Sequence, residues 1–212
     1  MNINYELEQY ILEHSEQESD LLKELNRETN VHIYHPRMLS GHLQGSILKM
    51  LTCMLKPQNI LEIGTYTGYS ALCFAEGLSP EGKIHTIEIN DELEDFIKQY
   101  VNKSENKDKI ILHFGDALKI IPTLNLKFDL VFIDADKKQY IEYYKIVFDK
   151  VKEGGYIIAD NVLWSGKVTE NYNDTDEQTR GIIDFNNFVQ NDKRVFNVIF
   201  PIRDGLMVIK KF

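Results

Sequence analysis

Acidic and amide side chains of the kinds that ligate a hard metal ion follow two separate apolar runs. Asp134 ends one run, and Asp160 and Asn161 end another. Two carboxylates and an amide carbonyl, completed by oxygens of water or substrate, suit Mg²⁺, whereas zinc prefers His or Cys ligands, which these segments lack. Either aspartate alone would more often be a helix or strand cap, but the set of three favours a metal site. We therefore predict that Asp134, Asp160 and Asn161 bind a divalent cation.

A glycine-bearing turn and two further run ends predict a nucleoside site. Gly64 and Gly68 are spaced Gly-x-x-x-Gly, which differs from the Gly-x-Gly-x-x-Gly of a pyrophosphate loop. Glu88 ends the next apolar run, 24 residues after Gly64, close to the ~20-residue offset at which an acidic group reaches ribose hydroxyls. Ala117, after the third run, is where an adenine would rest. The alternative is that these are only turn glycines and a solvated carboxylate.

Glu62 lies immediately before this glycine turn. A carboxylate there would repel a pyrophosphate and would attract a cationic amino-acid tail. The sequence therefore favours S-adenosylmethionine over NAD as the bound nucleoside.

These side chains need an open α/β sheet to position them. The apolar runs are separated by helical patterns up to the fifth run, which requires a mostly parallel sheet with helices on both faces. Only four residues separate the last two runs, so they should form an antiparallel hairpin. Ligands bind at the carboxyl ends of parallel strands, so the metal and nucleoside motifs should meet there. The predicted strands are Asn59–Ile63, Ile84–Ile89, Ile110–Phe114, Leu130–Asp134, Tyr156–Asp160, Val195–Pro201 and Leu206–Lys210; the clearest helices between them are Asp91–Val101 and Gln139–Val151, and Gly154-Gly155 is the predicted turn before the fifth strand.

The N-terminal region has helical spacing of apolar residues. Residues 5–29 predict one or two amphipathic helices, and Ser40–Leu55 predicts another that ends before Pro57. We predict one domain over residues 1–212, with 1–55 as an N-terminal helical cap. Residues 167–176 form the one long irregular loop that we predict, and both cysteines, Cys53 and Cys73, are predicted to be buried thiols.

Composition limits the class of protein. The chain has 212 residues and a formal net charge of −9, and no apolar run approaches the ~20 residues that a membrane span needs. The acidic balance argues weakly against a nucleic-acid partner, because such proteins usually carry a basic face. We predict a soluble cytoplasmic protein with no membrane partner.

Taken together, these segments resemble the caffeoyl-CoA and catechol type of metal-dependent O-methyltransferase. The resemblance extends from about Met38 to the C-terminus. It implies a Rossmann-like class I methyltransferase fold with a seven-stranded sheet, S-adenosylmethionine as methyl donor, and a homodimer. The segments that carry it are LEIGTYTGYS at 61–70, FIDADK at 132–137, DNVLWSG at 160–166 and DGL at 204–206.

The resemblance also implies roles for single residues. Asp134, Asp160 and Asn161 match the metal ligands of the family, and Lys137 matches the lysine that catechol-type members use as general base. Ser40 falls where the family lines the donor and metal pockets. The positions that would bind the donor are Met38, Glu62, Gly64, Ser70, Glu88, Ala117, Asp134 and Asp136.

The function that follows is methylation of one hydroxyl of a small catechol-like vicinal diol, with the metal favouring loss of the hydroxyl proton and Lys137 accepting it. Trp164 and the loop 167–176 either wall the substrate pocket or only pack. Two other functions stay open: methylation of a hydroxylated tRNA wobble uridine on the same scaffold, and a non-enzymatic adenosine-nucleotide binding module. Lys137 itself has the alternative of being a surface lysine at a helix start.

Overall fold

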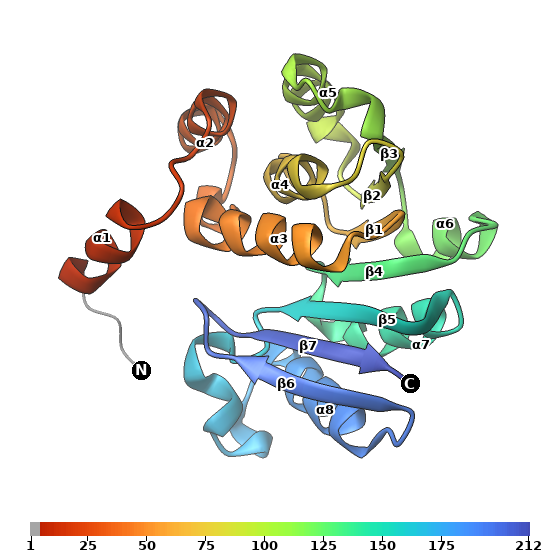
Figure 1. Ribbon diagram of the computed structural model, residues 1–212. Helices are drawn as coiled ribbons and strands as arrows, with labels where there is room; N and C mark the ends of the chain where they lie inside the picture. The colour runs from red at the N-terminus through yellow and green to blue at the C-terminus, as the bar shows by residue number, and fades with distance from the viewer. Residues whose placement is uncertain (1–4) are drawn as a thin grey trace.

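The computed structural model describes residues 5–212, and its centre is a single seven-stranded sheet (Figure 1). The strand order is β3-β2-β1-β4-β5-β7-β6. β7 runs antiparallel to both of its neighbours, and the other strands are parallel to one another. The predicted mostly parallel sheet with a C-terminal hairpin is confirmed. The strands are β1 (Asn59–Ile63), β2 (Lys83–Glu88), β3 (Ile110–Phe114), β4 (Phe128–Ile133), β5 (Val151–Asp160), β6 (Val195–Phe200) and β7 (Leu206–Lys211).

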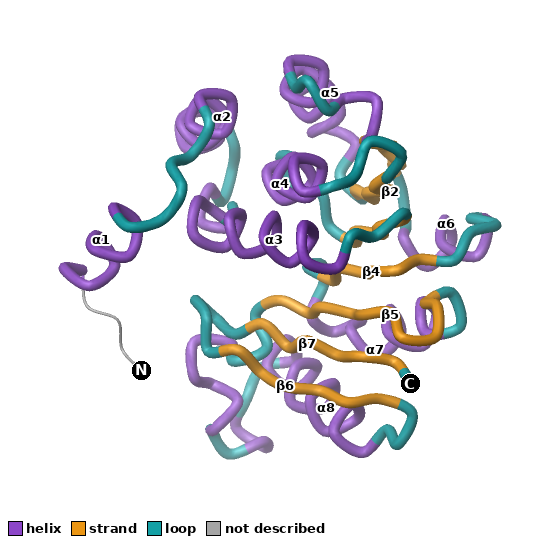
Figure 2. Tube along the Cα trace, in the orientation of Figure 1, coloured by secondary structure: helices purple, strands orange, loops and turns teal. Residues whose placement is uncertain are grey.

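Helices cover both faces of the sheet (Figure 2). One face is covered by α2 (Asp20–His32), α3 (Gly41–Leu55), α4 (Tyr69–Gly77) and α5 (Glu94–Lys103). The opposite face is covered by α6 (Ala117–Thr123), α7 (Tyr140–Phe148) and α8 (Glu177–Asn191). Short 3₁₀ turns join these elements: η1 (Pro36–Met38), η2 (Asp91–Leu93), η3 (Lys107–Lys109), η4 (Lys137–Gln139), η5 (Trp164–Thr169) and η6 (Tyr172–Asp174).

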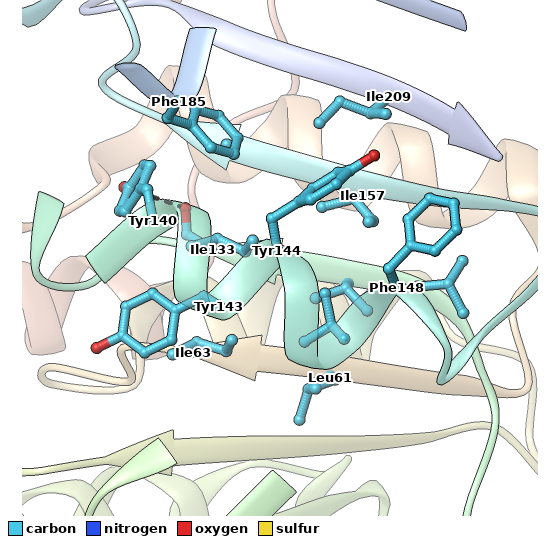
Figure 3. Close-up of a cluster of buried hydrophobic side chains, with 14 of the residues drawn as sticks. Leu61, Ile63, Ile133, Tyr140, Tyr143, Tyr144, Phe148, Ile157, Phe185 and Ile209 are labelled. Carbon is cyan, nitrogen blue, oxygen red and sulfur yellow. Dashed lines mark hydrogen bonds between the residues drawn. The ribbon is translucent and has the colours of Figure 1, made fainter. Parts of the chain in front are cut away.

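Period-two alternation along the strands divides the core into two layers. In β1, Ile60 belongs to the cluster under α2 to α5, whereas Leu61 and Ile63 belong to the cluster under α6 to α8. Figure 3 shows that second layer, where tyrosines of α7 pack against Phe185 of α8. Burying each such side chain stabilises the fold by about 1.5–3 kcal/mol.

Of the one or two amphipathic helices predicted over residues 5–29, the structure has two, α1 (Tyr5–Glu13) and α2. Ser19 caps α2 by accepting a hydrogen bond from the backbone N–H of Leu22. α2 packs through Leu22 and Leu25, whereas α1 has no buried residue and stands apart from the sheet in Figure 1. No helix within residues 5–212 is long and apolar enough to cross a membrane.

The fifth strand differs from its predicted bounds. Val151, which we placed at the end of a helix, pairs with Phe128 and begins β5. The strand continues through the predicted Gly154-Gly155 turn with a shift in register between Phe128 and Leu130, and Gly154 takes a positive φ of 74°. The glycines therefore make a bulge inside a strand, because pairing with β4 on both sides outweighs their turn tendency.

One prediction about the cysteines was wrong. Cys53 is exposed, because it lies on the same outer side of α3 as Met50 and Met54, whereas Cys73 is buried as predicted. The predicted loop 167–176 does connect β5 to α8, and it contains the end of η5 and all of η6.

The glycine of α8 at position 181 allows this helix to lie directly on the backbone of η4. A Cβ at Gly181 would lie 2.5 Å from the carbonyl oxygen of Lys137 and 2.9 Å from the Cα of Lys138. Gly181→Ala should therefore lower the free energy of unfolding by about 1–3 kcal/mol, although alanine in a helix normally stabilises. The exposed Asn187→Ala on the same helix is the matched control and should change it by less than about 0.5 kcal/mol. Urea unfolding measures both, and equal effects would contradict the close approach.

Candidate active site

A cavity of about 1260 Å³ opens where the parallel strands end. Its wall includes residues that follow β1, β2, β4 and β5, together with the loop around η1 and Arg203 of the β6–β7 connection. Except for Glu62, the predicted site residues all line it. Those residues are Met38, Ser40, Gly64, Ser70, Glu88, Ala117, Asp134, Asp136, Lys137, Asp160 and Asn161.

The register of the sheet brings the predicted residues together. Ile63 pairs with both Ile87 and Ile133, and Ile133 in turn pairs with Ala159. The next residue of each strand therefore emerges at the same level, which places Glu88, Gly64, Asp134 and Asp160 along one edge. Figure 1 shows the arrowheads of β4 and β5 side by side and pointing the same way.

Position 64 requires glycine because the backbone of Asp134 approaches it closely. The φ of Gly64 is +99°, and an added Cβ would lie 1.9 Å from the carbonyl oxygen of Asp134. Any other residue would push the glycine turn away from β4. The turn therefore has both the left-handed backbone and the empty space that only glycine supplies.

The nucleoside side of the cavity is held by backbone donors. Glu88 accepts hydrogen bonds from the backbone N–H of Tyr66 at 2.6 Å and of Asn90 at 2.9 Å. Burial raises the pKa of Glu88, and these N–H groups oppose that rise. Asp116 caps α6 through the N–H of Leu118, and this places Ala117 in the wall.

Glu62 lies behind the wall of the cavity and is fully buried. Its Oε2 accepts a hydrogen bond from the hydroxyl of Thr86, and Ser70 is a second partner. Its Oε1 has no hydrogen-bond partner among residues 5–212. Burial raises the pKa of Glu62 to about 8. A nearby cationic group would stabilise the Glu62 carboxylate. We predicted Glu62 to bind the donor, but its side chain lies behind the residues that line the cavity.

Two carboxylates, those of Asp134 and Asp160, line the part of the cavity next to the ends of β4 and β5. Asp160 is 3% exposed; its Oδ1 accepts from the N–H of Asn161 at 2.7 Å and its Oδ2 from Nε2 of Gln44 at 2.5 Å. Burial, and next the negative charge of Asp134, raise the pKa of Asp160 to about 7. Each oxygen of Asp160 keeps one lone pair free, so the carboxylates and the cavity-lining Asn161 fit a hard divalent cation, whose charge would offset their repulsion.

Lys137 is buried beside this pair. Its Nζ donates to Oδ1 of Asp134 at 2.8 Å and to the hydroxyl oxygen of Tyr140 at 2.6 Å. The Tyr140 hydroxyl donates to the carbonyl oxygen of Asp160 at 3.0 Å. The alternative of a surface lysine at a helix start does not hold, because Lys137 is 7% exposed and lines the cavity. Asp136 also caps η4 by accepting from the N–H of Lys138.

Several residues of the site were missed by the sequence analysis. Tyr66 has a positive φ of 51°, and its hydroxyl donates to the carbonyl oxygens of Tyr34 and His35, which fastens the loop around η1 over the cavity. Gln44 donates to Asp160, and Arg203 donates to Gln44. Only Gln44 left a signal, since it lies on the same helical face as Leu48 and is a polar residue in an apolar stripe.

Trp164, and Tyr172 of the loop 167–176, differ in whether they line the cavity or only pack against the protein. Trp164 lines the cavity, with its ring centroid 6.0 Å from Nζ of Lys137. Tyr172 is not among the lining residues, and its hydroxyl donates to Asp184 of α8 at 3.0 Å. Trp164 therefore forms part of the wall, whereas Tyr172 holds the loop onto α8.

Comparison with known proteins decides the family. The profile of the O-methyltransferase family matches residues 12–212. The chain belongs to this family. It is 34% identical to the caffeoyl-CoA O-methyltransferase of Petroselinum crispum, an alignment that covers 97% of this chain and 90% of that protein. The caffeoyl-CoA O-methyltransferase 5 of Nicotiana tabacum is 33% identical with the same coverage of both chains. The resemblance seen in the sequence motifs is confirmed.

Solved structures of two relatives share the fold. An O-methyltransferase from Bacillus cereus in complex with SAH superposes with a TM-score of 0.88 at 26% identity, over 98% of this chain and 97% of that one. An SAH-bound methyltransferase from Podospora anserina gives a TM-score of 0.90 at 28% identity, over 100% and 98% of the chains. The seven-stranded sheet of this O-methyltransferase is therefore that of its relatives.

The buried carboxyl of Glu62 predicts a pH-dependent stability. Its pKa is about 8 in the fold against an ordinary value of 4.5, so between these values the folded chain holds a proton that the unfolded chain has released. Stability due to Glu62 therefore falls as pH rises through this window. The free energy of unfolding of Glu62→Gln, minus that of the wild type, should increase by more than about 1 kcal/mol when the pH is raised from 5 to 8. Urea unfolding across this range measures the gain, and a difference independent of pH would contradict it.

Proposed function

We propose that this O-methyltransferase transfers a methyl group from S-adenosylmethionine to one hydroxyl of a small catechol-like vicinal diol, with a divalent cation, Mg²⁺, as cofactor. The observation that carries the proposal is the parallel pairing of Ile133 with Ala159, which makes Asp134 and Asp160 leave adjacent strands side by side next to Lys137. A bound cation would offset the repulsion between the buried Asp160 and the partly exposed Asp134 beyond what their contacts with Gln44 and Lys137 supply.

The proposed donor occupies the Glu88 side of the cavity. The relatives from Bacillus cereus and Podospora anserina contain SAH, the product of the same donor. In this chain Glu88 is held by two backbone N–H groups, so its carboxylate is preorganised to accept from ribose hydroxyls. Met38, Ser70, Ala117 and Asp136 line the rest of the donor pocket, and we propose that Glu62 stabilises the cationic tail from below.

The proposed metal ligands are Asp134, Asp160 and Asn161. When bound there, a divalent cation supplies positive charge that lowers the pKa of an adjacent substrate hydroxyl. Lys137 stands beside Asp134, and we propose that its side chain, as the neutral amine, receives the hydroxyl proton and becomes the ammonium. Tyr140 contacts Nζ of Lys137 from the other side, at 2.6 Å, so the lysine is positioned before the substrate arrives.

The chain then has to hold the deprotonated oxygen in line with the donor methyl. Trp164, Lys137 and the glycine turn at Gly64 all line the cavity in which the two reactants would meet. The new C–O bond forms as the C–S bond of the sulfonium breaks, and no covalent bond to the protein is needed. Such orientation supplies about 7–11 kcal/mol in well-aligned pairs.

The proposed acceptor is a small phenolic diol. The relatives from Petroselinum and Nicotiana are named for caffeoyl-CoA, a phenolic thioester. A tRNA wobble uridine gains no support from these relatives, and the net charge of −9 opposes a polyanionic partner. We therefore propose a small diol. We also propose a cytoplasmic homodimer; Tyr5 and Tyr10 of α1 and Met50 and Met54 of α3 are among the exposed apolar side chains that could contact a second copy.

The test is methyl transfer from labelled S-adenosylmethionine to caffeic acid, with Mg²⁺ and with EDTA. We expect turnover that needs the metal. Asp134→Ala should reduce turnover by more than about 10²-fold, because the cation then has only one carboxylate ligand, that of Asp160. Glu177→Ala is the matched control, an exposed carboxylate at the start of α8 outside the cavity wall.

The other outcomes separate the alternatives. Turnover that persists in EDTA and in Asp134→Ala would contradict a metal-assisted reaction. No turnover on any diol, together with salt-sensitive binding of tRNA, would favour RNA as acceptor. Donor binding without transfer to either class would favour a binding module.

A further inference from the structure

A buried glutamine joins the proposed metal ligand Asp160 to an arginine from the other end of the chain. Gln44 of α3 is 1% exposed. Its Nε2 donates to Oδ2 of Asp160 at 2.5 Å, and its Oε1 accepts from Nη1 of Arg203 at 3.1 Å. One carboxamide therefore has both of its ends occupied, one by the carboxylate and one by the guanidinium.

The arginine determines which way the carboxamide points. A guanidinium has only donors, so the atom of Gln44 that faces Arg203 must be the oxygen. The NH₂ group is then turned toward Asp160, which has only acceptors when ionised. Without Arg203 the carboxamide would be free to rotate away, and Oδ2 of Asp160 would lose its fixed donor.

The backbone of Arg203 indicates that this side chain has a specific role. Arg203 lies in the connection between β6 and β7 with a φ of +49°, a left-handed conformation that costs about 1–2 kcal/mol for a residue with a Cβ. Its Nη1 also donates to the carbonyl oxygen of Leu39 at 3.2 Å, beside Met38 and Ser40 in the cavity wall. Strained residues of this kind cluster at functional sites. Because Leu206 pairs with Asp160 in the sheet, the strained turn at Arg203 lies close to Asp160.

We propose that Gln44 and Arg203 are positioning residues for the metal site: Arg203 orients the Gln44 carboxamide, which in turn holds the Asp160 carboxylate with one lone pair of each oxygen directed away from the protein donors. As a neutral amide, Gln44 does this without adding a third negative charge to the pair formed by Asp134 and Asp160. This inference rests on the proposed function, since it assigns a role toward the proposed cation.

The test measures Mn²⁺ affinity of the purified full chain from the electron paramagnetic resonance signal of free Mn²⁺, with neither donor nor acceptor present. Gln44→Met keeps the side-chain length but removes the donor, and Arg203→Gly removes the guanidinium while relieving the left-handed backbone. Partners that orient a ligand typically contribute ten- to a hundredfold to metal affinity. We expect a loss of that order for Gln44→Met, and a smaller but measurable loss for Arg203→Gly without any fall in Tm.

Lys56→Gly is the matched control. Lys56 is an exposed cationic residue with a φ of +48° at the end of α3, outside the cavity wall. The change therefore relieves the same kind of backbone strain and removes the same charge. Its Mn²⁺ affinity should equal that of the wild type.

A double variant tests the order of the contacts. Because Arg203 acts through Gln44, the change Arg203→Gly should have no further effect on Mn²⁺ affinity once Gln44→Met is present. Additive losses would overturn the relay, and so would wild-type affinity in either single variant. A wild-type chain that binds no Mn²⁺ would overturn both this inference and the proposed metal site, whereas normal binding by every variant would overturn the inference alone.

Discussion

The parallel pairing of β4 with β5 brings the carboxylates of Asp134 and Asp160 together in one corner of the cavity, and the rest of the site is arranged around that constraint. Asp134 and Asp160 each follow a paired residue, so neither can move away without disturbing the centre of the sheet. Desolvation and their mutual repulsion raise the pKa of Asp160 to about 7. Like charges close together in a desolvated site destabilise the fold, which makes this pair of carboxylates a candidate for a functional site.

Neighbouring side chains donate hydrogen bonds to both carboxylates. Lys137 donates to Asp134, and Gln44 donates to Asp160. Gly64 has no Cβ, which allows the donor turn to pack against the carbonyl of Asp134. The donor pocket and the acidic corner therefore share a wall, and this shared wall is what would bring a methyl donor and an activated hydroxyl together.

The strand ends could be predicted from the sequence, whereas the contacts between distant segments could not. Asp134, Asp160 and Glu88 follow apolar runs, and the rule that parallel strands end at one edge places them in one cavity. Gln44 and Arg203 lie 159 positions apart in the chain and meet only through tertiary packing. The burial of Glu62 behind the wall and the exposure of Cys53 likewise depend on how α3 and α4 pack, which periodicity alone does not determine. Val151 was misplaced because pairing with Phe128 outweighed the helical pattern before it.

The most direct test of the central claim is anomalous diffraction at the manganese edge from crystals of the protein grown with Mn²⁺ and S-adenosylhomocysteine. We expect one strong anomalous peak in the cavity, with a carboxylate oxygen of Asp134, a carboxylate oxygen of Asp160 and the carboxamide oxygen of Asn161 all within about 2.0–2.6 Å of it. A difference map with no peak at these three side chains, in crystals whose donor pocket is filled, would contradict the claim that this corner of the sheet is a metal centre.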